Sequence, residues 1–193
     1  SSICDARVIW GGDSTIENVR QYQTPVRCID IAFADRYSLC IINADILLEQ
    51  NSSELTNIIE RFYNDTFIMD QNACSSPHLI VWLGKKKQKA KNQFWESLDA
   101  YVRKNYNLPS VSAVDKYNRL CQNAIDINIP FELIQHGNHI YRIVLDKLPD
   151  DIHNFRGNCG YFFEYDAKEL SEIIHIISNK FQTLTYFGLD KLS

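Results

Sequence analysis

Two spacings of apolar residues recur along the chain, and each predicts a different kind of element. Short apolar or alternating runs, typical of β-strands, cover residues 6–10, 28–32, 38–42, 78–83, 131–135, 140–145, 161–165 and 183–187. Apolar residues three or four positions apart, typical of amphipathic helices, cover residues 14–19, 53–62, 85–102, 114–125 and 170–177. Strands and helices therefore alternate for much of the length. This order predicts an α/β fold in three layers, with a largely parallel sheet covered by helices on both faces.

The amino-terminal segment combines a strand, a glycine turn and a helix. Gly11 and Gly12 follow the strand of residues 6–10, and Asp13 or Ser14 is expected to cap the helix. Two glycines let the backbone approach a phosphate or a ribose, and a helix start offers N–H donors to an anion. On spacing alone, a plain turn is equally consistent, because the longer dinucleotide fingerprint is absent and Asp13 carries negative charge.

Cys74 is the strongest candidate for chemistry in this chain. It lies in the polar segment 69–77, between the end of an apolar helix and an apolar strand. A thiol flanked by amides and hydroxyls can be held as a thiolate and can attack a carbonyl carbon. The alternative is a buried core cysteine, but Gln71, Asn72 and Ser75 are poor core formers. Asn72 is a possible local donor to the oxyanion that such an attack would create.

The remaining cysteines and histidines indicate neither a disulfide framework nor a metal site. Six cysteines are present, without a C-x-x-C pair, and most lie in apolar surroundings. This usage is typical of a reducing compartment. The cysteines and histidines also lack the ligand spacing of a zinc site, so we expect no metal.

Composition and charge restrict the class of protein further. The 193 residues are 45% hydrophobic and 23% charged, which suits one sizeable core, or a core plus a partial second domain. A net charge of -4 argues against a general nucleic-acid binder. The apolar runs are shorter than the roughly 20 residues of a membrane span, and the amino end lacks signal-peptide features. We therefore expect a cytoplasmic protein.

Three stretches, in this order and at these separations, resemble the LuxC family, the acyl-CoA reductases of bacterial luminescence systems. They are Val8–Ile16, Phe33–Ile42 and Asp70–Cys74, and the stretch from Arg156 to Thr185 is similar to a later segment of the family. The family is a branch of the aldehyde dehydrogenase superfamily, so the resemblance implies an aldehyde-dehydrogenase-like catalytic domain. Residues 1–25 would then be the end of the nucleotide-binding domain, and residues 26–193 a catalytic thiol domain that is truncated at its carboxyl end. Because the chain begins Ser1-Ser2, we expect an excised piece that does not turn over alone.

The resemblance also implies a reaction and a set of partners. Cys74 would carry a fatty acyl group as a thioester, and NADPH would reduce it to an aldehyde, with Gly11, Gly12 and Asp13 in contact with the cofactor. The acyl donor would be a fatty acyl-CoA or an acyl-protein synthetase, the enzyme would form homo-oligomers, and the host could be luminescent. Ordinary aldehyde dehydrogenases use the glutamate of E-L-G-G-K to activate water, but residues 30–36 of this chain contain no glutamate. That difference favours reduction over hydrolysis.

Two other functions stay open at this point. A cysteine acyltransferase or thioesterase would need a histidine beside Cys74, and His78 could turn back toward the thiol. A non-catalytic interaction module would keep the fold without the chemistry.

The lysine run from Lys85 to Lys91 is expected to be a solvated helix face. The aromatic residues around Phe62, Trp82 and Phe94 form either a core or an acyl tunnel.

Overall fold

The computed structural model describes residues 4–189 and divides the chain into two compact units, with the boundary between Arg36 and Tyr37. In the first unit, strands β1 (Ala6–Gly11) and β2 (Ile29–Ala34) are parallel neighbours, joined through helix α1 (Asp13–Arg20). Because β2 pairs with β1, the boundary falls later than the expected one between residues 25 and 26. The assignment of this unit to a nucleotide-binding domain stays a prediction.

A partly buried ion pair links the two strands of the first unit. The guanidinium of Arg7 donates from Nε to Asp30 Oδ1 at 2.9 Å and from Nη2 to Oδ2 at 2.6 Å. This bidentate hydrogen bonding from Arg7 lowers the pKa of the Asp30 carboxyl, because it stabilises the ionised form. Asp30 is therefore a structural carboxylate of the sheet.

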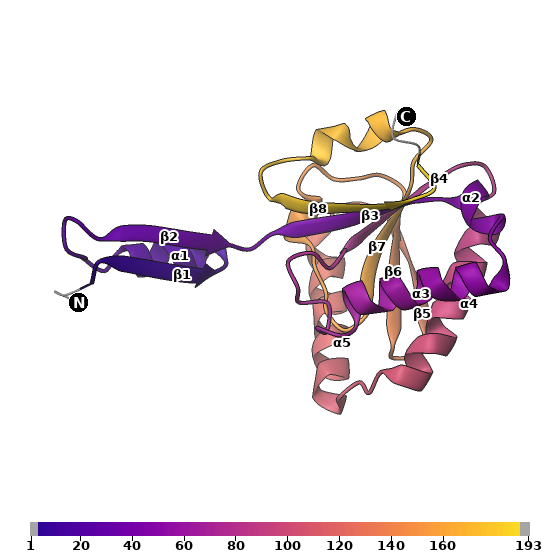
Figure 1. Ribbon diagram of the computed structural model, residues 1–193, viewed down its shortest axis with the longest axis horizontal. Helices are drawn as coiled ribbons and strands as arrows, with labels where there is room; N and C mark the ends of the chain where they lie inside the picture. The colour runs from indigo at the N-terminus through magenta and orange to yellow at the C-terminus, as the bar shows by residue number, and fades with distance from the viewer. Residues whose placement is uncertain (1–3, 190–193) are drawn as a thin grey trace. The chain divides into compact units, whose positions relative to one another are not determined.

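The second unit is built on a six-stranded sheet (Figure 1). Its strands lie in the order β5-β6-β7-β4-β3-β8, and all neighbours are parallel except the hairpin β5-β6. Their bounds are β3 Tyr37–Asn43, β4 Leu79–Leu83, β5 Phe131–His136, β6 Ile140–Leu145, β7 Tyr161–Asp166 and β8 Phe181–Phe187. The prediction of an α/β fold with a largely parallel sheet is confirmed.

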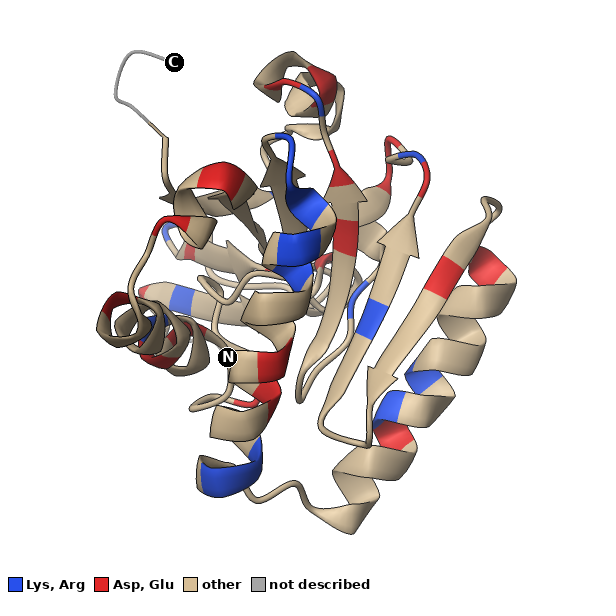
Figure 2. Ribbon diagram, turned by 90° about the vertical axis from the view of Figure 1, so that its right-hand side faces the viewer, with Lys and Arg blue, Asp and Glu red and all other residues tan. Residues whose placement is uncertain are grey.

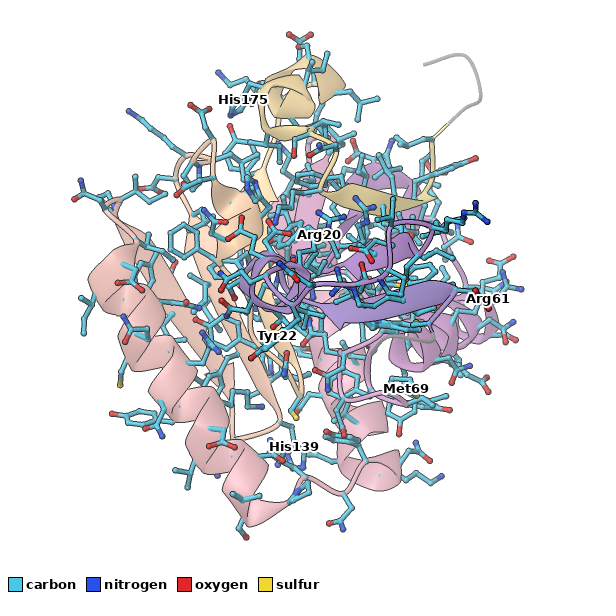
Figure 3. All side chains as sticks on the ribbon, turned by 90° about the vertical axis from the view of Figure 1, so that its left-hand side faces the viewer. Arg20, Tyr22, Arg61, Met69, His139 and His175 are labelled. Carbon is cyan, nitrogen blue, oxygen red and sulfur yellow. The ribbon has the colours of Figure 1, made fainter. Side chains whose placement is uncertain are left out.

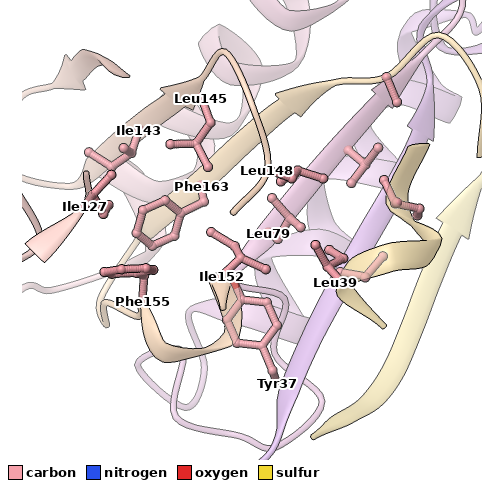
Figure 4. Close-up of a cluster of buried hydrophobic side chains, with 14 of the residues drawn as sticks. Tyr37, Leu39, Leu79, Ile127, Ile143, Leu145, Leu148, Ile152, Phe155 and Phe163 are labelled. Atoms are coloured by element: carbon pink, nitrogen blue, oxygen red, sulfur yellow. The ribbon is translucent and has the colours of Figure 1, made fainter. Parts of the chain in front are cut away.

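Helical segments cover both faces of this sheet, in the three layers that the sequence predicts. Cys40, Ile42 and Trp82 pack toward α2 (Ala44–Leu48), α3 (Ser52–Thr66) and α4 (Lys87–Asn105). The alternate residues, such as Leu39 and Leu79, pack on the other face, against α5 (Ser110–Asp126) and the 3₁₀ helices η1 (Ile152–Asn154) and η2 (Leu170–Ile176) (Figure 4). Since strand side chains alternate between faces, continuous apolar runs are what a sheet buried on both sides requires.

The helix boundaries agree with the sequence in some places and differ in others. Asn51 caps α3 in a capping box with Glu54, which confirms the expected start near Ser52. The cap of α1 is Gly12, so the expectation of Asp13 or Ser14 as the cap is wrong, and Asp13 is the first helical residue. The segment expected as a helix at 170–177 forms a 3₁₀ helix, and the short helix α2 was not predicted.

Candidate functional site

Cys74 lies in the connection between α3, which ends at Thr66, and β4, which begins at Leu79. This connection turns sharply, because Asp70 and Gln71 both adopt left-handed backbone conformations, with φ of 51° and 62°. Non-glycine residues take such conformations at a cost, which the surrounding contacts must offset. The loop is therefore held by its tertiary contacts, and the most extensive of these come from Gln71.

The side chain of Gln71 fastens the loop to the start of β7. It is fully buried, and Nε2 donates to Pro77 O at 3.0 Å and to Tyr161 O at 2.9 Å. Its Oε1 accepts from the backbone N–H groups of Gly160 and Tyr161, at 3.1 and 2.9 Å. All of the amide's polar atoms are thus engaged, and one side chain joins both ends of the Cys74 loop to the sheet.

The thiol of Cys74 is exposed, and two strands position it. Ser38 Oγ of β3 donates to the carbonyl oxygen of Cys74 at 2.7 Å, and Nε2 of Gln182, on β8, donates to Cys74 Sγ at 3.2 Å. The alternative of a buried core cysteine at position 74 is therefore wrong. An N–H donor aimed at the sulfur stabilises negative charge there, which is the form that reacts with carbonyl carbons.

Replacement of Gln182 by leucine removes this donor from the sulfur. We expect alkylation of Cys74 by iodoacetamide at neutral pH to slow about threefold to tenfold, the range for one hydrogen bond at an exposed group. Site-resolved mass spectrometry measures the rate. The matched control is Gln135→Leu on β5, the opposite edge of the sheet, which should leave the rate unchanged. Equal rates in all three proteins would show that Gln182 does not act on the thiol.

Asn72 does not direct its amide at the sulfur in this structure. The residue is exposed, and its Nδ2 donates to Asp70 O of the same turn at 3.3 Å. It lines a cavity of about 460 Å³ together with Lys116 and Arg156 of the second unit, and Cys74 is not among the lining residues. The structure therefore places Asn72 on the Cys74 loop, and its role as an oxyanion donor stays a prediction.

His78 does not turn back toward Cys74. Its ring is buried against Tyr37, with ring centroids 5.5 Å apart, and it shares a hydrogen bond with the backbone of Gly157. Burial, together with the positive charge of Arg156, lowers the pKa of His78 to about 4. Within residues 4–189, no histidine is hydrogen-bonded to Cys74 Sγ, so the histidine that an acyltransferase or thioesterase needs is not beside this thiol.

The buried ring of His78 makes stability depend on pH. Its pKa falls from 6.5 to about 4 on folding, so the unfolded chain binds more protons between these values. The free energy of unfolding should therefore fall as the pH drops from 6.5 toward 4, by up to about 1.4 kcal/mol per pH unit from this group. Urea unfolding at several pH values measures the slope. His78→Phe should flatten it, whereas His175→Phe at an exposed position should not; equal slopes would contradict the assignment.

The residues expected to contact a cofactor all belong to the first unit. Gly12 has open space where a Cβ would lie, and it opens α1, whose first N–H groups have no partners within the helix. A Cβ at Gly11 would lie 3.0 Å from the Thr15 side chain, so the close packing of β1 on α1 favours a glycine there. This turn suits a ribose or a phosphate, although Asp13 adds an acidic group in the first helical turn.

The lysine run is only partly a solvated face. Lys91 is buried and bonds to Asp166 at 2.6 Å, so for this residue the expectation is wrong (Figure 2 shows the basic start of α4 in blue beside strands with acidic positions in red). The backbone N–H groups of Lys85 and Lys86 donate to the carboxylate of Asp45.

Among residues 4–189, no cluster of histidine, cysteine and acidic side chains has the geometry of a metal site. Over the same residues, no helix has the length and apolar character needed to cross a bilayer.

Comparison with known proteins places this site in context. The model of the acyl-CoA reductase (LuxC) family matches residues 1–125. A long-chain acyl-protein thioester reductase of Photorhabdus laumondii is 24% identical over 187 residues, which cover 95% of this chain and 36% of the relative. The chain thus spans about a third of the length of this relative.

Solved aldehyde dehydrogenases share the fold. A gamma-glutamyl-gamma-aminobutyraldehyde dehydrogenase from Burkholderia cenocepacia J2315 superposes with a TM-score of 0.66 at 11% identity, over 97% of this chain and 41% of that one. An NAD-dependent benzaldehyde dehydrogenase from Corynebacterium glutamicum gives a TM-score of 0.61 at 9% identity, over 96% and 42%. At these identities the likeness shows an aldehyde-dehydrogenase-like fold and nothing of the substrate.

Proposed function

The chain belongs to the LuxC family of acyl-CoA reductases, and we propose that Cys74 accepts a long-chain acyl group as a thioester, which the enzyme then reduces to a fatty aldehyde. The observation that carries this proposal is the position of the thiol. Cys74 is exposed on a loop that Gln71 fixes, and its sulfur accepts a hydrogen bond from Gln182. A fixed, accessible and hydrogen-bonded sulfur is what nucleophilic catalysis by cysteine requires.

The first chemical step is thioester exchange at Cys74. The thiolate attacks the carbonyl carbon of an acyl-CoA or an acyl-protein, the C–S bond to the donor breaks, and the donor's thiolate leaves and takes up a proton. The tetrahedral oxyanion between these events needs donors. We propose that the backbone N–H groups of the Cys74 loop and the side chain of Asn72 donate to it. To do so, Nδ2 of Asn72 would give up only its 3.3 Å hydrogen bond to Asp70 O, which lies in an exposed turn.

The second step needs a nicotinamide, and we propose NADPH. When bound, this cofactor supplies the hydride that converts the Cys74 thioester to an aldehyde. Gly11 and Gly12 would let the backbone of the first unit approach its ribose or phosphate, and the N–H groups at the start of α1 would donate to it. Asp13 would accept from a ribose hydroxyl more readily than it would face a phosphate.

Two features of the structure favour reduction over hydrolysis. Asp30, in the segment where ordinary aldehyde dehydrogenases carry their water-activating glutamate, is held in an ion pair with Arg7. His78 is buried and hydrogen-bonded elsewhere. Neither group is free to activate water at a Cys74 thioester, so we do not propose a thioesterase.

The wider assignments follow from the same proposal. The chemistry requires a reduced thiol, and the six cysteines are free, which supports the cytoplasm as the location. An acyl-CoA or an acyl-protein synthetase would be the donor, and we propose a homo-oligomer that acts in a luminescence system.

An acyl-trapping experiment tests the proposal. The chain is incubated with palmitoyl-CoA, digested and mapped by mass spectrometry. We expect one palmitoyl group on the peptide that contains Cys74, released by hydroxylamine as a thioester should be. An adduct that is absent, or that forms equally on Cys121, the other exposed cysteine, would overturn the assignment. The chain spans 36% of the length of its relative. The experiment therefore tests acylation, the step that we assign to Cys74 of this chain.

A further inference from the structure

A groove of about 350 Å³ is lined by residues of α3 and of the outer strand β8, among others. One stripe of α3 forms its wall, with Asn57, Ile58, Arg61 and Phe62 at helical spacing of three and four residues. Arg61, labelled in Figure 3, extends from this helix at the polar rim. The volume falls within the range of small-molecule sites, which is roughly 300–1,000 Å³.

The floor of the groove is apolar and comes from the sheet. It contains Cys40 and Ile42 of β3, Thr185 and Phe187 of β8, and Phe94 of α4. The register pairs Cys40 with Thr185 and Ile42 with Phe187, so these side chains form two successive rows on the face that α3 covers. An apolar floor beneath a polar rim suits an alkyl chain better than a nucleotide or a sugar, which would need polar partners along its length.

Contacts of the Cys74 loop place this loop beside one end of these rows. Ser38, whose Oγ bonds the Cys74 carbonyl, precedes Cys40 by two residues and therefore lies on the same face of β3. Gln182, whose Nε2 bonds Cys74 Sγ, is the second residue of β8, the strand that carries Thr185. Asp65 lines the groove, and its carbonyl oxygen accepts from Ser76 Oγ of the Cys74 loop at 2.6 Å. From Gln182 to Phe187 the strand extends about 16 Å.

We propose that this groove holds the alkyl chain of the acyl group that Cys74 carries. The carbonyl carbon lies at the sulfur, near Ser38 and Gln182, and the chain runs along β8 over Cys40 and Thr185 toward Phe187. This inference rests on the proposed function, since it takes Cys74 as the acyl carrier. It assigns Phe62 and Phe94, which are also core residues, as the aromatic wall of the chain site, whereas Trp82 is core alone.

Binding of free fatty acids to the Cys74→Ala variant tests the groove apart from the thiol chemistry. Calorimetry with octanoate, decanoate and dodecanoate should show affinity that rises about fourfold for each added methylene, as burial of a methylene predicts. Affinity that does not depend on chain length would overturn the proposal.

A pair of tryptophan substitutions on one strand locates the site. Thr185→Trp fills the groove, whereas Leu184→Trp adds the same indole on the opposite face, where Leu184 is 49% exposed. We expect Thr185→Trp to weaken dodecanoate binding about tenfold or more, and Leu184→Trp to leave it unchanged. If thermal melting shows that Thr185→Trp does not fold, Asn57→Trp blocks the groove from the exposed side of α3. Equal binding by the blocked and control variants would overturn the proposal.

Failure of the groove and failure of the proposed function give different results. If the groove is wrong and the function right, palmitoyl-CoA acylates Cys74 in the wild type and in the blocked variant at equal rates. If the groove is right and the function wrong, Cys74→Ala binds dodecanoate with the expected dependence on chain length, while the wild type forms no acyl adduct.

Discussion

Replacement of Cys74 by alanine is expected to abolish acylation of the chain by palmitoyl-CoA. Removal of a nucleophile costs on the order of 10⁴-fold or more in rate, because no neighbouring group can form the same covalent bond. The fold should persist, because Cys74 is exposed. The substitution costs one hydrogen bond, which the exposed side chain of Gln182 donates to the sulfur. The measurement is the rate of palmitoyl incorporation by intact mass, with thermal melting as a check on folding.

Cys121→Ala is the matched control for this prediction. Cys121 is also exposed but lies on a different element, helix α5, so its loss should leave acylation unchanged. Cys74→Ser is the second informative variant, since it keeps the size and a hydrogen-bonding atom but supplies a much weaker nucleophile. Acylation that persists in Cys74→Ala and disappears in Cys121→Ala would move the acyl site to α5.

The sequence predicts the sheet well because the pattern of burial follows directly from the fold. Strands covered on both faces need apolar residues at every position, and β3 and β4 are buried along nearly their whole length. The exposed position of Cys74 was predictable for the complementary reason. Asn72 and Ser75 beside it are costly to bury, so the loop had to face solvent.

The partners of the site were not predictable, because they come from distant parts of the chain. Gln182 reaches the sulfur from 108 residues away, and Gln71 bonds Tyr161 from 90 residues away. The only local signal for Gln71 was its place in the stretch Asp70–Cys74, which resembles the LuxC family. Its neighbours in sequence predict an exposed polar turn, whereas its buried amide meets four backbone groups that only the assembled sheet brings together.

Charged residues inside the sheet are the other feature that sequence patterns missed. Glu164 lies in the apolar strand β7 and is fully buried, and Lys91 of α4 is 3% exposed. Hydrophobic periodicity cannot predict such positions, since buried charges occur only where tertiary partners neutralise them. Here Glu164 Oε1 accepts from Arg142 Nε of the neighbouring strand β6, and Lys91 Nζ lies 3.9 Å from Oε2.

Replacement of Glu164 by alanine is expected to lower the free energy of unfolding by about 3–5 kcal/mol, the range for removing one partner of a buried ion pair. The carboxylate also accepts from the indole N–H groups of Trp82 and Trp95, at 2.7 and 3.2 Å. Its loss would therefore leave both indole N–H groups and the charged guanidinium of Arg142 buried without their acceptor, in the layer between the sheet and α4. Urea unfolding followed by circular dichroism measures the change.

Two further variants separate the ionic network from general damage to the sheet. Glu132→Ala removes an exposed carboxylate from β5, and it should change the free energy of unfolding by less than about 0.5 kcal/mol. The double variant Glu164→Leu, Arg142→Leu removes both charges together, so it should be more stable than Glu164→Ala, even though both indoles lose their acceptor. If the double variant is the less stable of the two, the cost lies in lost packing and not in the uncompensated charge of Arg142. Strand β7 carries Glu164 and begins at Tyr161, whose backbone N–H donates to Gln71 of the Cys74 loop. If Glu164→Ala loosens β7, it should therefore also speed alkylation of Cys74.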